Sequence, residues 1–124
     1  MRSETKLYPR EALFDFTVSV FRHFDVPDAD ARTAATVLQS ADLRGIDSHG
    51  VARLHSYFDM LSLGRINPKA KIKIVRETAS TATVDGDNGL GLVVGPKANE
   101  IAMAKAAAAV PARQRGNVAA IRER

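Results

Sequence analysis

The residues best suited to chemistry lie together near the middle of the chain. His49, Arg53 and Tyr57 follow one another at intervals of four residues. Side chains four apart lie above one another on an α-helix, so a helix here would present an imidazole, a guanidinium and a phenol along one groove. Spacing alone is more typical of a solvated helix face, and it does not decide between the two interpretations.

The chemistry of these side chains fits a small carboxylate substrate. The guanidinium of Arg53 is a planar fork that matches a carboxylate through two hydrogen bonds. An imidazole exchanges protons near neutral pH, which makes His49 a candidate acid/base group, and Ser48 beside it is expected to orient the ring.

The other two histidines are weaker candidates. His23 lies close to Phe21 and Phe24, where a structural or solvent-facing role is the usual one. His49 and His55 are separated by about 240° around a helix, so a metal site made from this pair is not expected. The chain has no cysteine, which excludes disulfides and Cys-based zinc or redox sites.

Three helices, a hairpin and a fourth helix are expected to position these residues, which predicts an α+β fold. Gly45 and Gly64 are expected to end the second and third helices, and Asp47 or Ser48 to cap the third. The alanine-rich inner face of the second helix predicts close helix packing. The predicted helices span residues 11–24, 27–44, 47–63 and 93–108, and the predicted strands span 71–76 and 81–85.

The net charge of +4 and pI near 9.8 would favour nucleic acid as a partner, but the charge is unevenly distributed. Residues 110–124 hold four arginines and one glutamate, a net of +3, which leaves +1 for residues 1–109. The first six residues lack the apolar segment typical of a secretory signal, and no apolar stretch is long enough to be expected to span a membrane. A cytoplasmic protein with no nucleic-acid or membrane partner is therefore expected.

Residues 41–54 read ADLRGIDSHGVARL, and Tyr57 and GRINP (64–68) follow. Together with VDGDNGLG (84–91) and a helix containing GPKA (95–98), this string resembles the signature of the malate/L-lactate dehydrogenase family. Members of that family are non-Rossmann oxidoreductases that act on malate, lactate, ureidoglycolate, sulfolactate and cyclic imino acids. The resemblance covers about residues 8–107, and its specific part is Asp-Ser-His-Gly with an arginine four residues after the histidine.

The resemblance implies roles for four residues. His49 would be the proton donor and acceptor, Ser48 would relay charge to it, Arg53 would hold the substrate carboxylate, and Tyr57 would lie at the substrate pocket. It also implies hydride transfer between NAD or NADP and a 2-hydroxy/2-keto carboxylate, and a homodimer in the full-length form. The substrate and the choice between NAD and NADP stay open.

The resemblance also predicts a division of the chain. Residues 1–68 would be the N-terminal helical segment, residues 69–109 the start of the α/β cofactor-binding domain, and residues 110–124 an aberrant basic tail that is disordered or out of frame. The tail lacks the Asn-His-Phe-Gly-like motif that family members carry, so a frameshift or premature stop near residues 107–112 is the expected origin. The chain alone is expected to have little or no dehydrogenase activity.

Other readings compete with this one. Gly89, Gly91 and Gly95 come near a dinucleotide loop, but the third glycine is one residue late, and turns that let the last helix approach the hairpin are the favoured interpretation. A small helical interaction or nucleic-acid-binding module is the second functional candidate. A stand-alone domain that binds a carboxylate without catalysis is the third.

Overall fold

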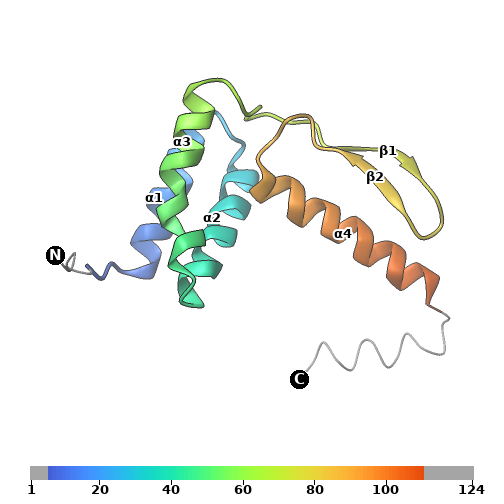
Figure 1. Cartoon of the computed structure of the whole chain (residues 1–124), viewed down its shortest axis with the longest axis horizontal. Helices are drawn as coiled ribbons and strands as arrows, with labels where there is room; N and C mark the ends of the chain where they lie inside the picture. Colours follow the sequence, from blue (N-terminus) through green and yellow to red (C-terminus); the bar gives the residue numbers. More distant parts are fainter. Residues whose placement is uncertain (1–5, 111–124) are drawn as a thin grey trace.

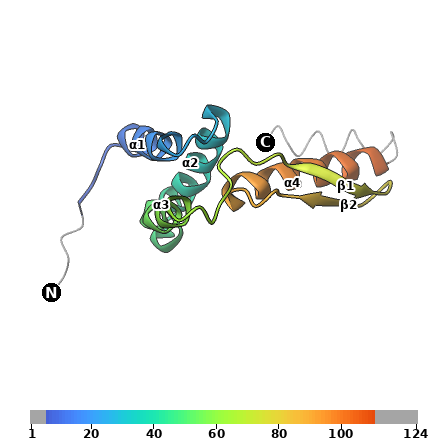
Figure 2. The same ribbon diagram turned by 90° about the horizontal axis from the view of Figure 1, so that it is seen from above.

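A computed structural model describes residues 6–110, and its α+β architecture confirms the predicted fold class. The three N-terminal helices gather at one end, and the hairpin and the last helix form the other end (Figure 1). Seen from above, the last helix lies along the hairpin (Figure 2). The elements are α1 (Arg10–His23), α2 (Asp28–Leu43), the 3-10 turns η1 (Asp47–His49) and η2 (Val51–Arg53), α3 (Leu54–Ser62), β1 (Lys73–Glu77), β2 (Ala82–Asp85) and α4 (Gly91–Ala109).

Helices α1 and α2 pack closely because the facing side of α2 is made of small residues. Ala31, Ala34 and Ala35 are buried, and they leave room for Phe21 of α1, whose exposed fraction is 0%. Burial of an aromatic ring against alanines removes a large apolar area from water. The close helix packing predicted from the alanine face is confirmed.

The predicted helix ends are confirmed where glycine adopts a left-handed conformation. Gly45 follows α2 with φ of 73°, and Gly64 follows α3 with φ of 64°. These conformations strain any residue that carries a Cβ, which is why glycine commonly ends helices.

The predicted third helix is wrong over its first half. Residues 47–53 form two 3-10 turns separated by Gly50, and α3 begins only at Leu54. Neither Asp47 nor Ser48 caps a helix through its side chain. The helix is interrupted by a competing hydrogen bond. The Val51 N–H donates to the Asp42 carboxylate at 2.9 Å and not to a backbone carbonyl of a regular α-helix.

The antiparallel hairpin confirms the two predicted strands, displaced by one or two residues. Lys73 pairs with Asp85 at one end, Glu77 with Ala82 at the other, and a bulge lies between Ile74 and Arg76. Strand β1 is exposed along its length, whereas Ala82 and Val84 of β2 are half-buried. Lys105 of α4 ties this helix to the hairpin, since its ammonium lies 2.9 Å from the Glu77 carboxylate and donates to the Thr78 carbonyl at 2.7 Å.

The interpretation of the glycine run is only partly correct. A Cβ at Gly89 would lie 2.6 Å from the Cβ of Ala70, so this glycine does permit a close approach. Gly91 and Gly95, however, lie inside α4, which begins two residues earlier than predicted, and a Cβ on either would meet open space. They are therefore neither turns nor a phosphate loop.

Side chains of the turn after β2 hold the hairpin against the segment that follows α3. The Asp87 carboxylate accepts from the Asn67 side chain at 3.0 Å and from the Lys71 backbone N–H at 2.8 Å. Leu90 and Val93 belong to the same buried cluster as the helices, so the core continues across the predicted boundary at residue 68. The division into domains stays a prediction, and residues 111–124 of the predicted tail lie outside the described range.

Candidate active site

The segment that carries His49 is held by the end of α2. Asp42, in the last turn of α2, accepts a hydrogen bond from Val51, and Gly50 is buried directly against its carboxylate. A Cβ at position 50 would overlap that carboxylate. Position 50 therefore has to be glycine while Asp42 keeps this position.

We expect Gly50→Ala to destabilise the chain by about 1–3 kcal/mol, because the added Cβ displaces the Asp42 carboxylate and breaks its hydrogen bond with Val51. Urea unfolding followed by circular dichroism would measure the loss. Gly95→Ala is the matched control, because its Cβ would meet open space and an alanine in a helix interior is favourable. A Gly50→Ala variant as stable as the wild type would contradict the close approach.

Ser48 contacts the candidate acid/base group directly. Its Oγ lies 2.9 Å from Nδ1 of His49, which leaves Nε2 of the ring without a protein partner among residues 6–110. Both side chains are exposed. This is the contact expected of a serine that orients the imidazole, and the part that the pair plays in proton transfer stays a prediction.

The side chain of Arg53 bends back onto the same turn. Its Nε donates to the Ser48 carbonyl at 2.9 Å, so the guanidinium folds back toward the residue that also contacts His49. In the described part of the chain, neither terminal nitrogen of Arg53 has a protein partner. The two terminal nitrogens are therefore available to bind a carboxylate end-on, through two parallel hydrogen bonds.

The prediction that these residues line a groove because they lie on successive turns of one α-helix is therefore wrong. His49 and Arg53 do not lie on successive turns of one α-helix, because η1 and η2 are separated by Gly50. They are related through Ser48, which contacts one with its hydroxyl and the other with its carbonyl.

Tyr57 links the turn to the core. It lies in α3, is half-buried, and its ring centroid is 6.3 Å from that of Phe21. Its hydroxyl has no hydrogen-bond partner within residues 6–110. The ring thus has a packing role that the sequence pattern did not predict, and its place at a substrate pocket stays a prediction.

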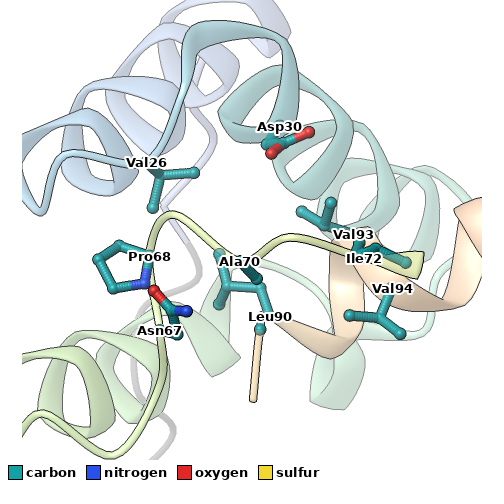
Figure 3. Close-up of a pocket in the computed structure, with 10 residues that line it drawn as sticks. Val26, Asp30, Asn67, Pro68, Ala70, Ile72, Leu90, Val93 and Val94 are labelled. Carbon is teal, nitrogen blue, oxygen red and sulfur yellow. The ribbon is translucent and has the colours of Figure 1, made fainter. Parts of the chain in front are cut away.

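Neither of two hollows in the described part of the molecule contains the four candidate residues. One lies at the junction of the helices with the hairpin and is lined mainly by apolar side chains such as Val26, Leu90 and Val93 (Figure 3). Its volume of about 10 Å³ is at the lower limit for a single water molecule. The other, of about 420 Å³, lies between β2 and α4 and includes Lys105, whose ammonium is already paired.

The remaining histidines behave as structural or surface groups. His23 is exposed and packs edge-on against the Phe24 ring at 5.1 Å, which confirms its predicted role. Nδ1 of His55 lies 2.7 Å from the Ala52 carbonyl. Among the described residues, no group of three or more His, Cys, Asp or Glu side chains is placed to hold a metal ion, and no helix combines the length and apolar character that a membrane crossing requires.

The roles of Asp42 and Gly50 were not predicted from the sequence, although a signal for Asp42 is present. A carboxylate in the last turn of a helix opposes the helix dipole and so calls for a specific partner. No local pattern showed that this partner is the amide of Val51, nine residues later.

A family model described as malate/L-lactate dehydrogenase matches residues 8–113. The chain belongs to this family. The resemblance noted from the Asp-Ser-His-Gly string is thereby confirmed, and the comparisons give no support to the alternative of a nucleic-acid-binding or helical interaction module.

Individual members of the malate/L-lactate dehydrogenase family are similar over most of the chain. The L-sulfolactate dehydrogenase of Methanocaldococcus jannaschii is 52% identical over 89 residues, which are 72% of this chain and 26% of that protein. The malate dehydrogenase of Pyrococcus horikoshii is 46% identical over 98 residues, 79% of this chain and 27% of that protein. The chain thus spans about a quarter of the length of these relatives.

The fold agrees with a solved structure from the same family. The structure of the M. jannaschii sulfolactate dehydrogenase superposes with a TM-score of 0.79 at 46% identity, and the match covers 82% of this chain and 29% of that one. The helices, hairpin and α4 therefore form the part of the malate/L-lactate dehydrogenase fold that the resemblance predicted.

Proposed function

We propose that residues 6–110 supply the proton-transfer and carboxylate-binding groups of an oxidoreductase that interconverts a 2-hydroxy and a 2-keto carboxylate. The observation that carries the proposal is the double contact of Ser48, with the His49 imidazole through Oγ and with the Arg53 guanidinium through its carbonyl. Two groups of complementary chemistry are thereby directed from one short turn, as such a substrate requires.

Each group has a defined task in this proposal. The two terminal nitrogens of Arg53 bind the substrate carboxylate, which places the adjacent carbon–oxygen bond beside the turn. Nε2 of His49 donates a proton to the oxygen in the reductive direction and accepts it in the oxidative direction. Ser48 holds the ring through Nδ1, and Tyr57 borders the substrate from α3.

The cofactor proposed is NAD or NADP, and it rests on family membership alone. The glycines nearest to a dinucleotide-binding loop, Gly91 and Gly95, lie within α4 and do not form such a loop. A homodimer and a cytoplasmic location are likewise predictions made from the family and the composition.

A chimera tests the proposal, because it supplies the part of the relatives' fold that lies beyond the segment matched by this chain. Residues 8–110 would replace the matching segment of the sulfolactate dehydrogenase relative. We expect the chimera to oxidise NADH or NADPH in the presence of a 2-keto carboxylate, and the reaction to be followed by absorbance at the reduced nicotinamide band. A chimera that folds and binds the cofactor but shows no substrate-dependent turnover would contradict the proposal.

A further inference from the structure

Asp42 has an environment that helix formation alone does not explain. Its carboxylate is half-buried in the last turn of α2, where the helix dipole disfavours a negative charge, and within residues 6–110 it forms no ion pair. It accepts one hydrogen bond, from the Val51 N–H at 2.9 Å. A carboxylate in this position requires a compensating contact, and Val51 supplies it.

The contact is favourable because of where Val51 lies. Val51 is the first residue of η2, so its N–H has no partner within that turn. The carboxylate satisfies this free donor in the way that an aspartate caps the start of a helix, except that it comes from a different element. A hydrogen bond to a charged acceptor is among the stronger ones in proteins.

The same contact determines the path of the chain between the two candidate groups. Val51 lies two residues after His49 and two residues before Arg53. The adjoining Gly50 carbonyl accepts from the Arg53 backbone N–H at 2.9 Å, and the Ser48 carbonyl accepts from Arg53 Nε at the same distance. If Val51 were released from Asp42, both sides of this turn would lose their common anchor.

We propose that Asp42 is a positioning residue, which anchors Val51 and Gly50 so that the His49 imidazole and the Arg53 guanidinium leave one turn in a defined mutual orientation. The inference rests on the proposed function for its catalytic meaning. The anchoring of Val51 and Gly50 by Asp42 does not depend on that function and is tested on this chain alone.

The experiment uses NMR on the 124-residue chain and its variants Asp42→Ala, Asp42→Asn and Asp28→Ala. Asp28 is the matched control, because it is an acid on the same helix whose partners are the exposed Arg22 and Arg32. We expect Asp42→Ala to speed amide exchange at Val51 by about tenfold or more, the usual size of a lost charged hydrogen bond. Residual dipolar couplings of residues 48–53 should change while those of α2 stay constant.

Asp42→Asn keeps the shape and an acceptor oxygen, so its exchange rate at Val51 and its couplings should lie between those of the wild type and Asp42→Ala. It also provides the test if Asp42→Ala loses its fold. Couplings in residues 48–53 that are unchanged in both variants would overturn the proposal. So would equal changes in residues 48–53 and throughout α2, since these would show a general structural role.

Titration with oxalate, a small dicarboxylate, separates this inference from the proposed function. We expect Asp42→Ala to weaken oxalate binding about tenfold or more, whereas Asp28→Ala should leave it unchanged. A wild-type chain that binds no oxalate would count against the proposed carboxylate site, while the couplings would still decide whether Asp42 positions the turn. Oxalate binding that is equally strong in wild type and Asp42→Ala would overturn the positioning role.

Discussion

His49→Ala is expected to lower kcat of the chimera by about 10²–10⁴-fold, the usual contribution of a positioned general acid/base. In the proposed mechanism the imidazole exchanges a proton with the substrate oxygen, and Ser48, whose Oγ lies 2.9 Å from Nδ1, orients the ring for that exchange. Removal of the ring leaves water to supply the proton. Because Arg53 remains, KM should change much less than kcat.

Steady-state kinetics across a range of pH would measure this effect. His55→Ala is the matched control, since His55 is a second exposed imidazole six residues away whose Nδ1 contacts the Ala52 carbonyl and not Ser48. The control should retain the kcat of the unsubstituted chimera. Equal losses in the two variants, or full activity in His49→Ala, would remove His49 from the proposed mechanism.

Arg53→Leu is expected to reduce kcat/KM by about 10²-fold, which corresponds to the loss of about two charge-assisted hydrogen bonds to the substrate. The two terminal nitrogens of Arg53 are the ones without protein partners in the described part of the chain, so they are the atoms that would hold the carboxylate. Arg53→Lys should recover only part of the loss, because an ammonium keeps the charge but not the planar fork.

Kinetics with a 2-keto carboxylate, and inhibition by oxalate, would measure the effect of Arg53. Arg76→Leu is the control, because Arg76 is an exposed cation on β1, far along the sequence from the turn. Oxalate should inhibit the Arg76 variant normally and the Arg53→Leu variant weakly. Unchanged oxalate inhibition in Arg53→Leu would show that the carboxylate is bound elsewhere.

Most elements were predictable because their signals are local. The apolar spacing of α1, the alanine face of α2 and the alternation of the hairpin depend only on residues that are neighbours in sequence. Gly45 and Gly64 end their helices for a reason that is also local, namely the left-handed conformation that glycine tolerates.

The third helix was predicted too long because its first half obeys the same local pattern. Val51 and Leu54 have helical spacing, and nothing between residues 47 and 53 forbids a helix outright. The carboxylate of Asp42 redirects the Val51 N–H, and this competitor belongs to the preceding helix. Local periodicity does not contain such a contact.

The amino-acid sequence determined the four candidate residues, His49, Ser48, Arg53 and Tyr57, together with the family and the order of the elements, because these depend on residue types and their spacing along the chain. Only the tertiary structure decided how the candidates meet. Arg53 contacts the Ser48 carbonyl, and Val51 is anchored by Asp42, nine residues earlier in the chain. Both contacts form only when the backbone folds. The direction of a short turn depends on which acceptor binds its free backbone N–H, and this acceptor is in place only when α2 and the turn pack together.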